Sequence, residues 1–124
     1  RLIYGDFHIG QLLADQGRAY FLDFDSFARG EPEQDLAEFI VSLLFAGVAP
    51  DLVRAMAAAL LATYARHAAW TILIERLHWH AHVQFVTRVH RFFRELRPGW
   101  QAALQRCFDE VNLDEVLPPL DQAS

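Results

Sequence analysis

The sequence predicts a mostly α-helical α+β domain, in which a small β segment precedes a group of helices. The β segment is indicated by two short runs, Gln11 to Asp15 and Arg18 to Phe24, which flank a Gln16-Gly17 turn signal typical of a hairpin. After residue 35, long stretches rich in Ala, Leu and Arg favour helix. With 124 residues, no internal repeat and no linker, the chain is expected to form one domain.

Four helices are expected after the hairpin and a loop over residues 26–34. Asp35 and Glu38 form a capping-box pattern at the start of the first helix, which is apolar on nearly every side and therefore expected to be buried. Pro50 suits the first turn of the second helix, and Pro98-Gly99 stops the third. The predicted helices are Leu36 to about Ala46, Pro50 to about His67, about Thr71 to Arg97, and Trp100 to Val111.

Three segments follow from this pattern: residues 1–35 with the hairpin, the helical residues 36–111, and an acidic tail, 112–124, expected to be loose. Charge is uneven, because residues 1–51 carry nine acids and three arginines, whereas residues 52–106 carry two acids and eight arginines. A uniformly basic nucleic-acid binder would not show this pattern. The longest apolar run, Phe39 to Pro50, is too short to span a bilayer.

A single cysteine, Cys107, excludes an internal disulfide framework and favours a reduced, cytoplasmic setting. We expect Cys107 to be a small buried hydrophobe. The chain has no lysine and begins at Arg1 rather than at methionine, so we expect it to be part of a longer protein.

The chemically notable residues lie near the start of the chain. Asp6 follows Tyr4-Gly5 in a turn-rich segment, Gln11 comes five residues later, and Asp23 and Asp25 follow an apolar strand. Carboxylate and amide oxygens gathered in this way are hard ligands, which suit Mg²⁺. Mg²⁺ typically takes one or two protein oxygens, and substrate phosphates can supply its other ligands.

The order of these motifs resembles the C-terminal lobe of the aminoglycoside phosphotransferase and choline kinase-like family, whose members are relatives of protein kinases. That family has a His-Gly-Asp-x-x-x-x-Asn loop, an Asp at a strand end, then Gly-Asp-Pro and Asp-Leu-Ala. The corresponding residues here are Tyr4-Gly5-Asp6 with Gln11, Asp23, Gly30-Glu31-Pro32 and Asp35-Leu36-Ala37. The family's N-terminal ATP-binding lobe, with its phosphate-gripping lysine, has no counterpart in this chain, so residues 1–124 alone are expected to be inactive.

The resemblance implies ATP and Mg²⁺ as cofactors and a role for each matching residue. Asp6 would be the catalytic base for an attacking hydroxyl, and Gln11 and Asp23 would hold Mg²⁺. Asp25 and His8 would assist at the metal or touch the substrate, while Asp35 and Tyr4 would brace the catalytic loop. The implied enzyme is a kinase that transfers the γ-phosphate of ATP to a hydroxyl of a small molecule, with no nucleic-acid or membrane partner.

Two departures from the family pattern bear on the acceptor. Tyr4 replaces a histidine and Gln11 replaces an asparagine, and His8-Ile9-Gly10-Gln11 is similar to the His-x-Gly-Gln of maltokinase-like sugar kinases. Residues 40–105 hold only three acids among many arginines, whereas an aminoglycoside pocket would be richly acidic. A sugar or another neutral or anionic metabolite is therefore favoured. The alternatives are an aminoglycoside phosphotransferase and a degenerate kinase-like module that binds without catalysis.

Other patterns in the helical segment have simpler interpretations. The triplet His78, His80 and His82 lacks an obvious third and fourth zinc ligand, so packing or substrate contact is favoured over a metal site. The arginines at every third position favour a solvated helix face, and the large aromatic residues favour core and interhelix packing. These are Arg88, Arg91, Arg94 and Arg97, and Trp70, Trp79, Phe85, Phe92 and Phe93.

Overall fold

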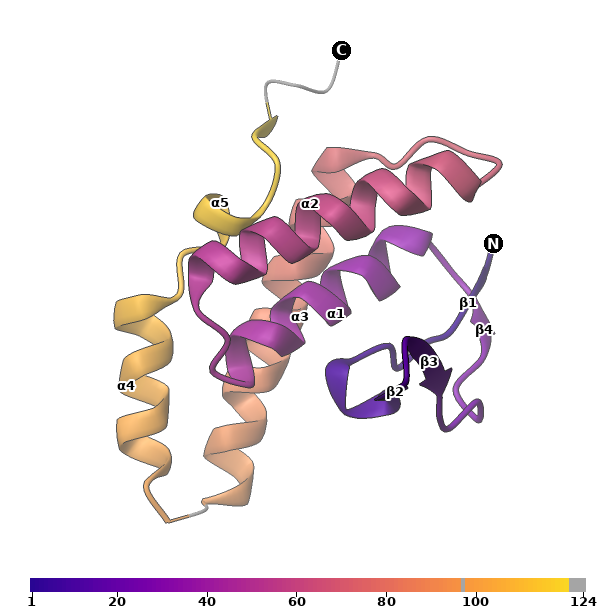
Figure 1. The fold of residues 1–124 in the computed structure, drawn as a ribbon. Coiled ribbons are helices and arrows are strands. Elements are labelled where there is room, and N and C mark those ends of the chain that lie inside the picture. The colour runs from indigo at the N-terminus through magenta and orange to yellow at the C-terminus, as the bar shows by residue number, and fades with distance from the viewer. Residues whose placement is uncertain (97, 121–124) are drawn as a thin grey trace.

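A computed structural model of the chain describes residues 1–96 and 98–120, and it confirms a mostly helical α+β fold with a small hairpin (Figure 1). In chain order the elements are β1 (Leu2–Ile3), the 3-10 helix η1 (Ile9–Gln11), β2 (Leu12–Asp15), β3 (Arg18–Phe21), β4 (Ala28–Arg29), α1 (Pro32–Phe45), α2 (Pro50–His67), α3 (Ile74–Glu95), α4 (Trp100–Glu110) and α5 (Leu113–Val116).

Helix α1 forms the centre of the domain, because it packs against both α2 and α3 (Figure 1). It is apolar almost all round, and Ile40 and Val41 are completely buried, as the sequence predicts. Helices α2 and α3 present narrower apolar faces, and the short α5 closes the core against α2. The main core side chains are Leu36, Ile40, Leu43, Val53, Ala57, Leu61, Leu77, Leu113 and Val116.

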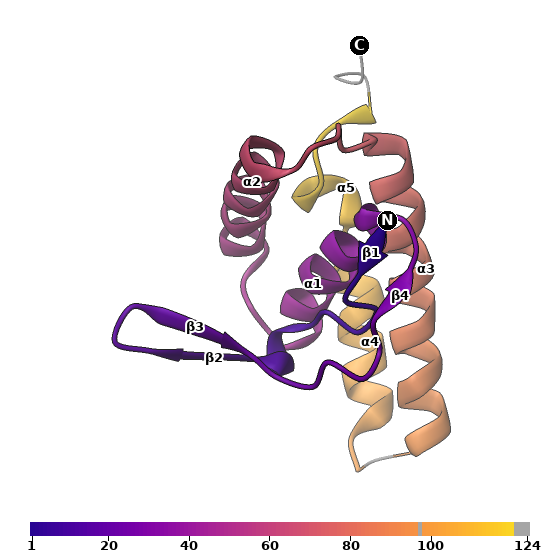
Figure 2. The ribbon, with the colours of Figure 1, turned by 90° about the vertical axis from the view of Figure 1, so that its right-hand side faces the viewer.

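The predicted hairpin is present and extends away from the helices (Figure 2). Strands β2 and β3 pair antiparallel from Leu12 opposite Phe21 to Asp15 opposite Arg18. The turn residues Gln16 and Gly17 both have positive φ, 45° and 77°, which is the conformation that a two-residue hairpin turn requires. Strands β1 and β4 form a second antiparallel pair. This pair was not predicted from the sequence, because each strand has only two residues.

Several predicted boundaries are wrong. The strand predicted to run to Phe24 ends at Phe21, because Asp23 adopts a left-handed backbone conformation (φ 58°) that interrupts an extended chain. Helix α1 begins at Pro32 rather than Leu36, since proline is suited to the first helical position. Asp35 therefore lies within the first turn and is not the helix cap, and the predicted capping box does not form.

The third helix begins at Ile74 rather than Thr71 and ends at Glu95. Its predicted end, Arg97, lies outside the described residues. The prediction of a loose tail from Asn112 is wrong for the first part of that segment, because Asn112 caps α5 and both Leu113 and Leu117 are buried. Apolar side chains spaced one helical turn apart stabilise the fold more when they are buried in the core than when they remain in solvent.

The aromatic residues divide between core and surface. Phe85 and Phe92 pack against Phe45 of α1, as predicted. Phe93 is 60 % exposed, but its ring lies 5.8 Å from that of Trp100 of α4, which confirms interhelix packing. Trp79 is 67 % exposed, so the packing predicted for it is wrong. Both exposed residues lie on α3, which has more aromatic residues than one buried face can hold. Cys107 is buried, as predicted. Among the described residues, the helices lack the combination of length and apolarity needed to cross a membrane.

Candidate active site

Three of the predicted site residues meet at the base of the hairpin. The Nε2 atom of Gln11 lies 3.4 Å from Asp6 Oδ2 and 3.5 Å from Asp23 Oδ2, so one amide faces two carboxylates. Residue pairing explains this convergence, because the backbone N–H of Leu22 donates to the carbonyl of Gln11 at 2.9 Å and extends the hairpin ladder by one step. Gln11 and Asp23 thus flank the ladder's end, and the turn before η1 brings Asp6 beside them.

The segment carrying Asp6 is held by Asp35 from the first turn of α1. The backbone N–H of Tyr4 donates to Asp35 Oδ2 at 2.6 Å, and that of Gly5 donates to Asp35 Oδ1 at 2.9 Å. Both carboxylate oxygens are therefore used to fix the two residues that precede Asp6. Gly5 has φ of 85°, and a Cβ there would collide with the carbonyl of Ser26, so this turn requires glycine.

Tyr4 supports the same turn by packing. Its ring lies 5.7 Å from that of Phe7, 5.6 Å from that of Phe24 and 5.5 Å from that of Phe27, measured between ring centroids. Burial and the nearby carboxylates, Asp23 foremost, raise the pKa of Tyr4, which keeps the phenol neutral. The aromatic ring occupies the middle of a cluster that joins the turn to the segment after β3.

The remaining two predicted residues differ in their placement. His8 Nε2 lies 3.6 Å from Asp6 Oδ2, and His8 Nδ1 accepts a hydrogen bond from the backbone N–H of Gly10 at 3.1 Å. An accepting Nδ1 places the ring proton on Nε2, which faces Asp6. Asp25 is exposed and does not join the group formed by Asp6, Gln11 and Asp23.

A pocket of about 380 Å³ opens beside His8, between η1, the end of α1 and the second half of α3. We call it the His8–Arg88 pocket. The backbone N–H of Ile9 donates to the buried Ser42 hydroxyl at 2.9 Å, which fastens η1 to α1 and shapes this wall. The lining residues are His8, Ile9, Gly10, Ser42, Phe45, Ala46, Arg88, Arg91, Phe92 and Glu95.

Sequence reasoning missed a buried acid–base pair behind this pocket. Glu38 of α1 is only 7 % exposed, and its Oε1 lies 3.8 Å from Arg88 Nη2 of α3. Burial, followed by the charge of Asp6, raises the pKa of Glu38 to about 7, although Arg88 opposes the shift. The prediction of a solvated arginine face is therefore wrong for Arg88. The available signal was a single acid in the middle of an otherwise apolar helix.

The elevated pKa of Glu38 predicts a pH-dependent stability. Because the folded state keeps this proton to higher pH than an unfolded chain does, ionisation of Glu38 destabilises the fold as pH rises from about 4.5 to about 7. We expect Glu38 to account for about 3 kcal/mol of the fall in unfolding free energy across this range. Urea denaturation of Glu38→Gln at several pH values should show that this component is missing.

The matched control is Glu75→Gln, which changes an exposed acid in the first turn of α3. This variant should retain the pH dependence of the unmodified protein. Identical pH profiles for Glu38→Gln and the unmodified protein would show that Glu38 ionises normally in the folded state.

The three closely spaced histidines contact different partners. His78 Nε2 lies 2.7 Å from the carbonyl of Pro118, His80 Nε2 lies 2.8 Å from Glu31 Oε2, and His82 Nδ1 lies 2.8 Å from the carbonyl of His78. Within residues 1–96 and 98–120, no group of three or more His, Cys, Asp or Glu side chains could hold a metal ion. These contacts favour a packing role for the histidines.

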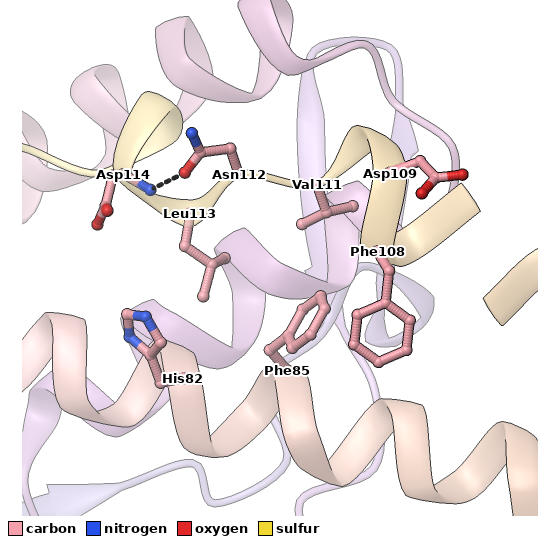
Figure 3. Close-up of a pocket in the computed structure, with 8 residues that line it drawn as sticks. All are labelled: His82, Phe85, Phe108, Asp109, Val111, Asn112, Leu113 and Asp114. Carbon is pink, nitrogen blue, oxygen red and sulfur yellow. Dashed lines mark hydrogen bonds between the residues drawn. The ribbon is translucent and has the colours of Figure 1, made fainter. Parts of the chain in front are cut away.

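A second pocket, of about 460 Å³, lies between α3, α4 and α5 (Figure 3). Phe85 and Phe108 form its apolar part, and Asn112 accepts a hydrogen bond from the backbone N–H of Asp114 at its rim. None of the predicted site residues lines it, and the hairpin lies on the other side of α1 (Figure 1). Of the predicted site residues, His8 lines the His8–Arg88 pocket, and its Nε2 atom lies 3.6 Å from Asp6 Oδ2, so this pocket adjoins the group formed by Asp6, Gln11 and Asp23.

The fold is that of the helical lobe of a kinase-like protein, with a small hairpin beside its central helix. The model of the phosphotransferase enzyme family matches residues 1–70, more than half of the chain, and the chain belongs to this family. The match confirms the resemblance seen in the motifs, and it includes all the predicted site residues. No curated protein and no solved structure matches the chain.

Proposed function

We propose that this chain is the catalytic lobe of a small-molecule kinase, which transfers the γ-phosphate of ATP to a hydroxyl group. The supporting observation is the meeting of Asp6, Gln11 and Asp23 at the base of the hairpin, with the turn before Asp6 held by Asp35. Phosphoryl transfer depends mainly on positioning and on charge neutralisation, and this arrangement suits both needs.

The residues present fit a magnesium ion. Asp23 offers a carboxylate oxygen, and rotation of the Gln11 amide, whose Nε2 lies 3.5 Å from Asp23 Oδ2, would bring the amide oxygen to the same place. Mg²⁺ is commonly bound by one or two carboxylates while water and substrate phosphates complete its coordination. In this proposal the ion would neutralise charge on the transferred phosphate. Gln11 directly precedes β2, and Asp23 follows Leu22, whose backbone N–H donates to the Gln11 carbonyl, so the pairing of the two strands sets the separation of Gln11 and Asp23.

Asp6 would orient the attacking hydroxyl and accept its proton. It lies on the side of the cluster that faces His8, and His8 lines the pocket in which an acceptor would bind. The two hydrogen bonds from Asp35 limit movement of the turn that carries Asp6. Pre-organisation of this kind lowers the entropic cost of bringing the hydroxyl to the phosphate.

The lining of the pocket bears on the acceptor class. Arg88 and Arg91 contribute two guanidinium groups, against the single carboxylate of Glu95. A polycationic aminoglycoside would be repelled by this balance, which supports a neutral or anionic acceptor such as a sugar or sugar derivative.

The test is phosphorylation of a panel of sugars, amino alcohols and aminoglycosides by the full-length protein that carries this chain. We expect ³¹P NMR to show conversion of ATP to ADP and a phosphate monoester with Mg²⁺, and no conversion after chelation with EDTA. Phosphorylation that persists without a divalent ion would contradict the proposed metal site. Magnesium-dependent binding of ATP without any transfer would instead favour a binding module.

A further inference from the structure

We propose that the acceptor carries an oxyanion group, and that Arg88 and Arg91 bind this group in the His8–Arg88 pocket. The inference rests on the proposed function and specifies the substrate class of the same site. Three observations support it: Arg88 lacks close partners, the pocket lining is rich in positive charge, and the pocket lies next to Asp6.

Arg88 lacks the close partners that a buried guanidinium normally has. Its side chain is 16 % exposed, its contact with Glu38 is 3.8 Å long, and its buried Nε has no hydrogen-bond partner among the described residues. Charge-assisted hydrogen bonds are normally 2.7–2.9 Å long, so the pairing with Glu38 is loose. Guanidinium donors form a planar fork that matches a carboxylate or a phosphate, and such a ligand would accept hydrogen bonds from the Nη atoms, of which Nη2 makes only the loose contact with Glu38.

The charges of Glu38 and Asp6 both act on Arg88, but among the described residues the only ion pair that Arg88 makes is the loose one with Glu38. Burial keeps Glu38 protonated to an unusually high pH, so its carboxyl group is only a partial counter-ion. Burial also lowers the pKa of Arg88, which reflects the unfavourable position of this cation away from water. Arg91 lies one helical turn further along α3 and lines the same pocket, which adds a second cation.

The groups that line the pocket suit a small acceptor that carries both a hydroxyl and an oxyanion. His8 forms one wall and lies 3.6 Å from the proposed base, Asp6. Phe45 and Phe92 stack with ring centroids 5.8 Å apart and provide an apolar surface. The guanidinium groups come from the facing helix, α3. An acceptor with a hydroxyl near His8, a compact body on the rings and an oxyanion at Arg88 would use all three.

The first measurement compares four pyranose probes that differ in charge: glucose, glucosamine, glucuronate and glucose 6-phosphate. Binding to the full-length protein is followed by saturation-transfer NMR, and phosphorylation by release of ADP. We expect glucuronate or glucose 6-phosphate to bind at least tenfold more tightly than glucose, and glucosamine to bind least. A preference between the two anionic probes distinguishes a carboxylate from a phosphate. Equal affinities for all four, or no binding of either anionic probe, would overturn the proposal.

The second measurement assigns the preference to named residues. In the double variant Glu38→Gln/Arg88→Gln both charges are removed together, which avoids leaving an unpaired buried charge. This variant and Arg91→Gln should each weaken binding of the anionic probe by about tenfold to a hundredfold, the effect of losing a charge-assisted hydrogen bond, while glucose binding stays the same. Arg94→Gln is the matched control, since Arg94 is an exposed arginine of α3 that does not line the pocket.

These outcomes separate the inference from the proposed function. Arginine-dependent binding of an anionic probe without any phosphorylation would support the oxyanion site and contradict the kinase proposal. Phosphorylation of glucose or glucosamine that is insensitive to the arginine variants would support the kinase and overturn the oxyanion site.

Discussion

Replacement of Asp6 with asparagine should reduce phosphotransfer by about a thousandfold, within the range that general acid–base groups contribute. Asparagine has nearly the same size as aspartate, so the turn held by Asp35 should keep its shape. The side chain, however, can no longer accept a proton from the acceptor hydroxyl. The expected result is a large fall in kcat, with little change in the binding of magnesium and ATP.

Steady-state kinetics of the full-length protein and calorimetric titration with ATP would measure the two quantities separately. Asp15→Asn is the matched control, because Asp15 is an exposed aspartate at the end of β2 opposite Arg18. It should leave kcat unchanged. Full activity in Asp6→Asn would remove Asp6 from its proposed role. Equal losses in both variants would indicate damage to the hairpin rather than to catalysis.

Replacement of Asp35 with asparagine should weaken both the stability and the activity of the protein. The carboxylate accepts hydrogen bonds from the backbone N–H groups of Tyr4 and Gly5, and an amide can accept only one of these while presenting its own donor to the other. We expect a loss of about 2 kcal/mol in unfolding free energy. Activity should fall by about a hundredfold, because misplacing a catalytic group by about 1 Å has an effect of this size.

Hydrogen exchange provides a readout that a general loss of stability would not reproduce. In Asp35→Asn, the amides of Tyr4 and Gly5 should exchange much faster, whereas amides in the middle of α1, such as that of Ile40, should lose only the protection that follows from the lower global stability. Unchanged protection of both turn amides, together with full activity, would show that Asp35 does not position the loop.

Much of the fold follows from local features of the sequence. The two-residue turn at Gln16-Gly17 and the apolar run of α1 depend on neighbours a few residues away, and both were predicted correctly. The order Asp6, Gln11, Asp23 and Asp35 also identified the family without any knowledge of the coordinates. Motif spacing is a one-dimensional property, and a sequence displays it directly.

The start of α1 and the packing of α5 could not be predicted from the sequence, because in each case tertiary contacts compete with weak local preferences. Asp35 has the local features of a helix cap, yet its carboxylate is used by the backbone of residues about thirty positions earlier. The composition of the acidic segment after Asn112 favours exposure to solvent. Leu113 and Val116, however, lie on one face of α5 and are buried where α5 packs against α2. Long-range contacts outweighed local propensity in both cases.

By itself, the sequence determined the class of fold, the family and the set of residues on which the proposed chemistry depends. Only the tertiary structure decided that Gln11 faces both Asp6 and Asp23, and that Glu38 of α1 lies against Arg88 of α3 beside a pocket. The physical reason is that burial and charge act through space. A residue's pKa and its available partners depend on neighbours that packing supplies, and these can lie fifty residues away along the chain.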